Sequence, residues 1–226
     1  MANVIVYDDE SEDLTAEGEL LSFGYKWLGK KRVYLPSVLD YFKPCSEGRL
    51  HYNDRLLVIE SHKVLSSADM MVTFNGKNFD WKMHNTKFLL YGLPPIQPIP
   101  HVDLYQVAKH NLLIRGKSLE NLGRVLGLKN QKLKLPFSVW RAATKGDVKS
   151  LKLIIAHNKA DVLMTEELYY KLRHLVRQHP RLNGYEPCRR CGKDALERRG
   201  RAITIYRGQQ WKFHCTSCGA WETRAA

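Results

Sequence analysis

The stretch Met70-Met-Val-Thr-Phe-Asn75-Gly-Lys-Asn-Phe-Asp80 decides the fold class. Its first five residues are a short apolar run, which predicts a buried β-strand. Asn75-Gly76 is a turn signal, and we expect a helix over about Phe79 to Tyr91 to follow it. Folds in which strands pass directly into helices bind their ligands where the strands end. Asp80 therefore stands where such a fold places a functional carboxylate, with capping of the helix as the competing interpretation.

Further elements are expected on both sides of this stretch. Strands are predicted at Asn3–Tyr7 and Leu20–Leu28, with Arg32–Leu35 paired to the second. Helices are predicted at Leu56–Ser66, Leu104–Leu112, Ser118–Leu126 and Val148–Val176, the first capped by Asn53 and the last by Asp147. Strands first, and then strands alternating with helices, predict a mixed α/β domain over residues 1–180.

Two carboxylates follow the first expected strand. If that strand continues, the side chains of Asp8 and Glu10 lie on the same face. Like charges on one face repel each other, so such a pair needs a nearby cation or a proton. Hard divalent ions such as Mg²⁺ prefer oxygen ligands of this kind. A solvated acidic turn is the alternative interpretation.

The expected final helix carries a histidine and an aspartate on one face, because His157 and Asp161 are four residues apart. By itself this pair fits either a catalytic site or an ordinary hydrogen bond between two exposed side chains.

Together the three groups resemble the DEDD exonucleases of the ribonuclease H-like superfamily. The closest likeness is to the compact branch related to the proofreading domains of family B DNA polymerases. Asp8–Glu10 matches the first motif, Asp-x-Glu, and Asn75–Asp80 matches the second, Asn-x-x-x-Phe-Asp, without a gap. His157–Asp161 matches the spacing of the third, Tyr-x-x-x-Asp, and Val102-Asp103-Leu104 resembles a recurrent feature of this branch.

Two positions depart from the family pattern. Asp9 stands where an apolar residue is usual, which predicts that the strand ends at Tyr7 or Asp8, or that Asp9 points to solvent. His157 replaces the tyrosine of the third motif. Its ordinary pKa lies near neutrality, so it remains suited to orient a water molecule or to act as a general base.

The resemblance implies a ribonuclease H-like central sheet flanked by helices and a metal-dependent 3′→5′ exonuclease. Two Mg²⁺ or Mn²⁺ ions would be held by Asp8, Glu10, Asp80 and Asp161, with His157 as a further catalytic residue. The implied substrate is nucleic acid, with DNA favoured and RNA left open as the alternative. A structure-specific endonuclease of the same superfamily and a non-catalytic nucleic-acid-binding accessory protein are the alternatives.

The formal net charge of +13 independently indicates a polyanionic partner, most commonly nucleic acid. A basic segment between the second and third motifs is a candidate phosphate track, with a solvated surface as the alternative. Its residues are Arg115, Lys117, Arg124, Lys129, Lys132 and Lys134. We also expect Asn75, Phe79 and Trp140 near the substrate. Phe79 either stacks on a base or belongs to the core, and the core is the simpler interpretation.

The sequence gives no indication of a membrane protein. No apolar run approaches the roughly 20 residues that span a bilayer. The N-terminus lacks the basic start and apolar stretch of a secretion signal. We therefore expect a cytoplasmic protein, within a bacterial host if a bacteriophage encodes it, because short nucleases with a fused ribbon look like phage enzymes.

Four of the five cysteines form a second, small module over residues 181–226. Cys188-Arg-Arg-Cys191 and Cys215-Thr-Ser-Cys218 have the spacing of a structural zinc ribbon that binds one Zn²⁺, and redox cysteines are the alternative. Its two strands are expected at Ala202–Tyr206 and Trp211–His214. The residues expected to contact nucleic acid are Arg189, Arg190, Arg199 and Trp211, and protein docking is the competing interpretation.

Overall fold

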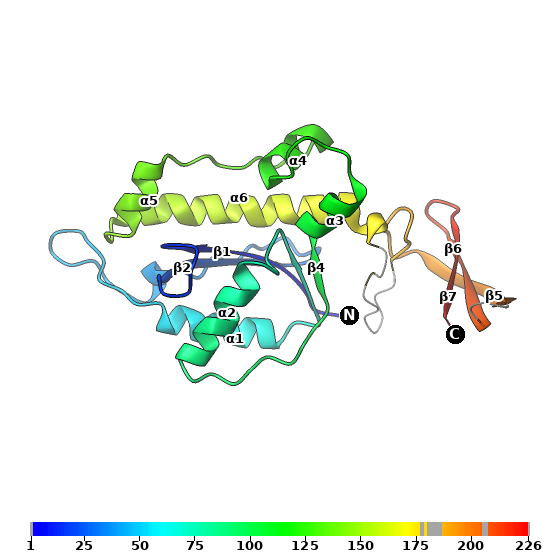
Figure 1. Ribbon diagram of the computed structural model, residues 1–226, viewed down its shortest axis with the longest axis horizontal. Coiled ribbons are helices and arrows are strands. Elements are labelled where there is room, and N and C mark those ends of the chain that lie inside the picture. Colours follow the sequence, from blue (N-terminus) through cyan, green and yellow to red (C-terminus); the bar gives the residue numbers. More distant parts are fainter. Residues whose placement is uncertain (1, 177–178, 180–186, 205–207, 226) are drawn as a thin grey trace.

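The computed structural model describes residues 2–176, 179, 187–204 and 208–225. Most of the chain surrounds a four-stranded mixed sheet with the order β2-β1-β3-β4 (Figure 1). Its strands are β1 (Val4–Ser11), β2 (Leu20–Trp27), β3 (Met70–Thr73) and β4 (His101–Asp103). β1 is antiparallel to β2 and parallel to β3, and β3 is parallel to β4. The predicted mixed α/β class is confirmed.

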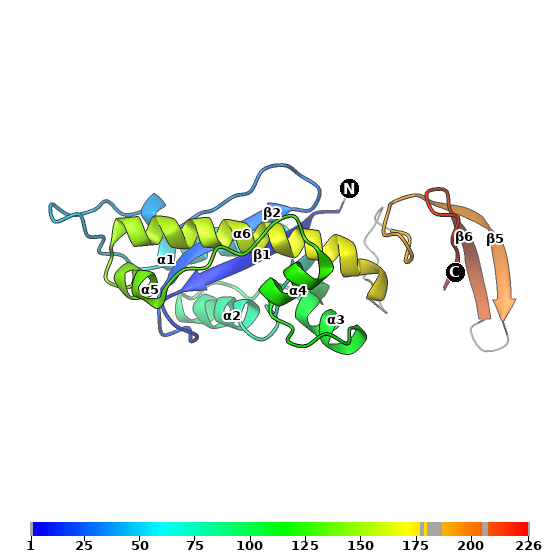
Figure 2. The same cartoon turned by 90° about the horizontal axis from the view of Figure 1, so that it is seen from above.

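Helices cover both faces of this sheet (Figures 1 and 2). One face carries α1 (Arg55–Ser66) and α2 (Asp80–Leu90), and the other carries the long α6 (Val148–Leu172). Along α6 lie α3 (Leu104–Asn111), α4 (Leu119–Leu126) and α5 (Phe137–Ala143). Two short 3₁₀ helices, η1 (Val38–Asp40) and η2 (Arg173–Leu175), complete this part.

The alternation of β1 sorts its side chains between the two helical layers. Val4 and Val6 belong to the apolar cluster that contains Met164 and its neighbours on α6. Ile5 and Tyr7 belong to the cluster that includes buried residues of α1 and α2. Successive side chains of a strand point to opposite faces. If β1 stays regular, Asp8 and Glu10 must therefore face α6, and Asp9 must face α2.

Several local predictions need correction. Arg32–Leu35 forms no regular strand, although Tyr34 makes an isolated bridge to Tyr25 of β2 and stacks on its ring. Asp54, not Asn53, is the N-cap of α1. Leu56, the first residue of the predicted helix, is 47% exposed, because α1 buries Leu57, Val58, Ser61 and Leu65 instead. α5 was not expected, and α6 ends at Leu172 rather than Val176.

The C-terminal part forms a separate antiparallel sheet of β5 (Leu196–Thr204), β6 (Gly208–Cys215) and β7 (Trp221–Ala225). The strand predicted to end at Tyr206 starts earlier, and its last two residues lie outside the described residues. The third strand, β7, was missed by the sequence analysis. Among the described residues, no helix combines the length and the apolar character that crossing a bilayer requires.

Candidate active site

A cleft of about 990 Å³ opens where β1 and β3 end, and all four predicted carboxylates line it. Asp8 and Glu10 come from β1, Asp80 begins α2, and Asp161 lies in the middle of α6. The predicted residues His157, Asn75, Phe79, Lys132 and Trp140 line the same cleft. Carboxylates from β1, α2 and α6 therefore meet in one place.

Glu10, His157 and Asp161 form the tightest group. One ligand atom from each lies within 4.8 Å of the others, and all three residues are buried. His157 Nε2 is 3.7 Å from Glu10 Oε1 and 3.8 Å from Asp161 Oδ2. The arrangement follows from β1 facing α6 and from the four-residue spacing on that helix.

The orientation of His157 is set by the backbone. Its Nδ1 contacts the carbonyl oxygen of Leu133, which only accepts hydrogen bonds, so Nδ1 carries the proton. In the neutral ring, Nε2 then presents a lone pair toward Glu10 and Asp161. Trp140 packs edge-on against the imidazole, with ring centroids 5.6 Å apart. The histidine is thus held with its basic nitrogen facing the carboxylates.

Asp9 corrects the sequence analysis. β1 does not stop at Tyr7 or Asp8, and Asp9 does not point to solvent. Its carboxylate lies 2.9 Å from Nε2 of the fully buried His84 on α2. Its backbone N–H donates to Asp80 Oδ1 at 3.0 Å. Asp9 therefore links β1 to α2 and holds the Asp80 carboxylate in the cleft.

Two residues position the candidate ligands through partners that are distant in sequence: Asn158, which the sequence analysis missed, and Asp103, which it noted only as part of a family feature. Asn158, fully buried beside His157, donates from Nδ2 to Asp8 Oδ2 at 3.0 Å. A Cβ at Gly24, opposite Asp8 in the sheet, would lie 2.3 Å from the Asn158 side chain, so this contact requires glycine there. Asp103 accepts hydrogen bonds from the backbone N–H groups of Asn75 and Lys77, which secures the loop before Asp80.

The predicted phosphate-binding residues divide into two sets. Lys132 lies in the cleft, with its ammonium 2.5 Å from Asp161 Oδ2. Lys117 instead donates to the carbonyl oxygen of Ile114. Lys134 makes an exposed ion pair with Glu120, of the kind that contributes little to stability. Of these three lysines, only Lys132 contacts one of the four candidate carboxylates of the cleft.

Phe79 is not a core residue. It lines the cleft immediately before Asp80, and 45% of its surface is exposed. The interpretation of Phe79 as core was therefore wrong. Asn75 also lines the cleft and adopts a positive φ of 64°, a conformation that asparagine tolerates better than most residues.

Burial and mutual repulsion disfavour negative charge in this cleft. Desolvation, followed by repulsion from Glu10, raises the pKa of Asp8 well above its ordinary value. Desolvation and repulsion from Asp161 do the same for the pKa of Glu10. Desolvation, with repulsion from Asp9, raises the pKa of Asp80 to about 7. These carboxylates thus need positive charge or protons to coexist.

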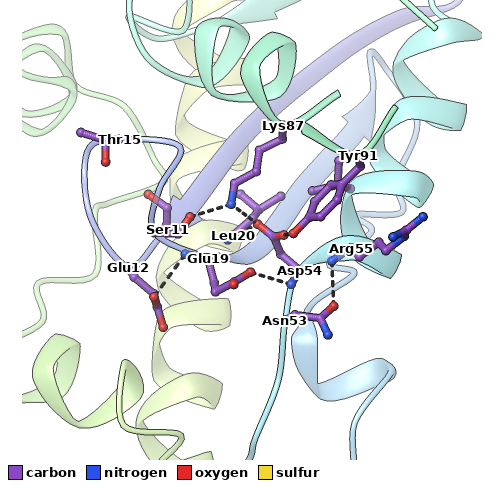
Figure 3. Close-up of polar contacts among 12 residues, drawn as sticks. Ser11, Glu12, Thr15, Glu19, Leu20, Asn53, Asp54, Arg55, Lys87 and Tyr91 are labelled. Carbon is purple, nitrogen blue, oxygen red and sulfur yellow. Dashed lines mark hydrogen bonds and ion pairs between the residues drawn. The ribbon is translucent and has the colours of Figure 1, made fainter. Parts of the chain in front are cut away.

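The wall of the cleft beside β1 is formed by residues 11–16 of the β1–β2 loop, and a buried polar network anchors this loop (Figure 3). Lys87 donates to the carbonyl oxygen of Gly18 at 2.7 Å and pairs with the fully buried Asp54, also at 2.7 Å. Asp54 accepts the N–H of Leu20, and its own N–H donates to Glu19. The loop is therefore fixed to α1 and α2.

A comparison with protein-family models matches residues 11–173 to the RNase_H superfamily. This span covers most of the chain and includes Asp80, His157 and Asp161. The chain belongs to the RNase H superfamily. The match begins one residue after Glu10, so the first motif rests on the geometry described above. No curated protein matches the sequence significantly.

Membership in the RNase H superfamily confirms the predicted ribonuclease H-like fold and indicates nuclease-type chemistry on a nucleic-acid substrate. Nucleases of this superfamily generally use divalent metal ions, and the donor set fits them. It consists of carboxylate oxygens, the ligands that Mg²⁺ and Mn²⁺ prefer. Asp161 Oδ1 is buried and has no hydrogen-bond partner among the described residues, which leaves an oxygen available to an ion.

The raised pKa values predict how metal and pH act on the stability of this RNase H superfamily protein. A carboxyl group whose pKa is higher in the folded state stabilises the fold below its unfolded value, and this contribution is lost as the pH rises through the folded value. For Asp80 that window runs from its ordinary value up to about 7. With EDTA, we expect a lower melting temperature at about pH 8 than at about pH 5. Mg²⁺ should raise the melting temperature more at the higher pH, where the ion does not compete with protons for the carboxylates.

Thermal melts at the two pH values, with EDTA and with Mg²⁺, test this expectation. Asp80→Asn should flatten the pH dependence in EDTA, whereas the same change at the exposed Asp194 serves as the control. A Mg²⁺ effect that is equal at both pH values would contradict the assignment of these carboxylates as ligands.

The four paired cysteines also converge. Their Sγ atoms lie within 4.8 Å of one another, and the pairs Cys188–Cys218 and Cys191–Cys215 are 3.7 and 3.6 Å apart. These distances are too long for disulfides and suit tetrahedral coordination. Burial raises the pKa of Cys215, but hydrogen bonds from the backbone of Cys218 and Ser217 outweigh it and lower this pKa to about 7. The cluster is therefore compatible with zinc.

The surface of this C-terminal sheet carries the predicted cations. Arg189, Arg190 and Arg199 are exposed, although Arg199 pairs with Glu197. Trp211 is half-buried, with the guanidinium groups of Arg198 and Arg201 at 4.3 and 4.5 Å from its ring. The tryptophan thus serves here as a platform for two arginines.

Proposed function

We propose that this protein is a divalent-metal-dependent nuclease that hydrolyses phosphodiester bonds. The observation that carries the proposal is the convergence of Asp8, Glu10, Asp80 and Asp161 in one cleft with the imidazole of His157. Membership in the RNase H superfamily supports it. So does the repulsion among the carboxylates, because a phosphate enters such a site only with cations between it and the acids.

The four carboxylates would hold two Mg²⁺ or Mn²⁺ ions. Such ions, when bound, activate water and stabilise charge that develops on the phosphate and on the leaving oxygen. The protein's own groups do the rest. Nε2 of His157 orients the attacking water and accepts its proton, because Nδ1 is committed to Leu133. Asn158 and Asp9 fix the positions of Asp8 and Asp80.

Lys132 adds a cation to the mouth of this acidic site. Its ammonium pairs with Asp161, and its side chain is 31% exposed. When ions occupy the carboxylates, this ammonium is free to turn toward an entering phosphate. We therefore propose that Lys132 contributes to substrate binding.

More specifically, we propose a 3′→5′ exonuclease of the DEDD type, acting on DNA. The three matching motifs and their order support this assignment. The exposed ring of Phe79, next to Asp80 in the cleft, suits stacking against the terminal base. Asn75, on the same loop, is positioned to contact the adjacent nucleotide.

Incubation of 5′-labelled single strands, duplexes and RNA–DNA hybrids with Mg²⁺, Mn²⁺ or EDTA tests the proposal. We expect a ladder that shortens from the 3′ end with either metal and no cleavage in EDTA. Internal cuts would instead identify a structure-specific endonuclease. Binding without cleavage would overturn the enzymatic proposal in favour of an accessory protein.

For the C-terminal part, we propose that residues 181–226 form a zinc-ribbon domain beside a nuclease domain of residues 1–180. The converged cysteines support one structural Zn²⁺. The exposed Arg189, Arg190 and Arg199 and the arginine-flanked Trp211 support nucleic-acid contact by this domain.

A further inference from the structure

A stripe on α5 lies next to the cleft and has no role in the site described above. Phe137, Arg141 and Lys145 succeed one another at four-residue intervals, so they lie on the same side of the helix and of the turn that follows it. All three are exposed, and 72% of the Phe137 surface is accessible to solvent.

Phe137 joins two hollows. It lines the cleft of about 990 Å³ that holds the carboxylates. It also lines a hollow of about 310 Å³ whose other walls include Arg141 and Lys145. The cleft and the hollow on α5 therefore share Phe137. A nucleic-acid strand that leaves the cleft can pass over this phenylalanine into the hollow.

The charges of the two hollows are opposite. Acidic side chains dominate the cleft, whereas the hollow on α5 holds two cations and no acid. Among the described residues, neither Arg141 nor Lys145 has an ion-pair partner, and the guanidinium of Arg141 lies 5.3 Å from the ring centroid of Phe137. The cations are thus available to phosphates.

The other side of α5 keeps this stripe in place. Ala143 is fully buried, and Val139 and Trp140 pack against the core. Trp140 also meets the imidazole of His157, which couples α5 directly to the catalytic group. Within α5, the four-residue step from Phe137 to Arg141 rises by about 6 Å. The helix that carries the stripe is therefore held against the core beside the cleft.

We infer that Phe137, Arg141 and Lys145 form a binding site for single-stranded nucleic acid, which holds the part of the strand that lies beyond the three terminal nucleotides in the cleft. A base stacks on the Phe137 ring, and Arg141 and Lys145 each bind a phosphate. This inference rests on the proposed nuclease function, because it takes the cleft as the place where the strand ends. It explains how a strand remains bound next to a strongly acidic site.

The test uses the full-length protein and two labelled oligothymidylates, a trinucleotide and one of about twelve nucleotides, a length within the range that single-strand sites cover. Phe137→Ala, and separately Arg141→Ala with Lys145→Ala, should each raise the KM for the longer strand about tenfold. The KM for the trinucleotide and both kcat values should stay within about twofold, since the carboxylates are untouched. Lys152→Ala with Lys171→Ala, two exposed cations on α6 that line neither hollow, is the matched control.

Salt dependence adds a second readout. The double variant of Arg141 and Lys145 should reduce the slope of log binding constant against log salt by about 1.4, or about 0.7 for each phosphate lost. The control variant should leave the slope unchanged. Oligouridylates of the same lengths show whether the surface also accepts RNA.

The outcomes separate this inference from the proposed function. If the wild-type protein cleaves both oligonucleotides but the variants show the wild-type KM for the longer one, the α5 site is wrong and the nuclease stands. An equal rise in both KM values would also exclude it. If the wild-type protein cleaves neither, the nuclease proposal fails. Fluorescence anisotropy of the longer strand then decides the inference, and equal dissociation constants for wild type and variants would overturn it.

Discussion

Replacing Asp161 with Asn is expected to lower the rate of Mg²⁺-dependent hydrolysis by about a thousandfold while leaving the fold intact. The substitution preserves shape but removes the charge that an ion requires, and losing about 4 kcal/mol of transition-state stabilisation corresponds to that factor. The fold should tolerate it, because Asp161 contributes to the repulsion that raises the pKa values of Asp8 and Glu10. Lys132, which loses its partner, is partly exposed and can turn to solvent.

Single-turnover cleavage of an end-labelled strand, together with a thermal melt in EDTA, measures both effects. Asp13→Asn is the matched control. Asp13 lines the same cleft but is exposed, and its carboxylate accepts hydrogen bonds from the backbone and the hydroxyl of Thr15 in the same loop. Its substitution should change the rate by less than about twofold, as for most surface positions. An Asp161→Asn protein with more than a tenth of the wild-type rate would refute the role of this carboxylate.

Removing zinc is expected to unfold the C-terminal sheet and leave the nuclease sheet folded. The buried apolar cluster of the C-terminal sheet consists of Cys188, Cys215 and Ala220, with a few half-buried neighbours that include the other two cysteines. A core this small does not offset the entropy of ordering three strands. Structural zinc supplies on the order of 10 kcal/mol in such modules, so the metal should decide whether the module folds.

Elemental analysis should find one zinc per chain, and hydrogen exchange should show protected amides along β6 only while it is bound. Cys188→Ser and Cys215→Ser should each abolish both signals. Cys45→Ser is the control, because Cys45 is exposed and lies far along the sequence from the cluster. If β6 remained protected after complete zinc removal, the metal would not be structural.

Several secondary-structure elements, and the pairing of Asp8 with Glu10 and of His157 with Asp161, could be predicted because they depend on residues close together in sequence. The apolar run at Met70 and the turn at Asn75-Gly76 predicted β3 and α2 to within a residue or two. Alternation along β1 placed Asp8 and Glu10 on one face, and the four-residue spacing aligned His157 with Asp161. Each inference needed only the geometry of one element and its neighbours in sequence.

The remaining features depend on which distant elements pack together. Asp9 looked anomalous because its partner, His84, lies 75 positions away on α2. The contact of Asn158 with Asp8 depends on α6 crossing β1. The exposure of Phe79 and Phe137 could not be predicted either. The sequence around an apolar residue at a helix start does not show whether another element covers that residue in the folded protein.

Short-range periodicity and spacing in the sequence were enough to predict the class of fold and the two cysteine pairs, and the resemblance to the DEDD exonucleases singled out the four candidate carboxylates. Only the tertiary structure decided that the acids share one cleft, that Asp9 turns inward and that α5 presents a cationic stripe beside it. Burial, charge repulsion and long-range hydrogen bonds depend on which elements pack against each other, and that packing is set only when the chain folds.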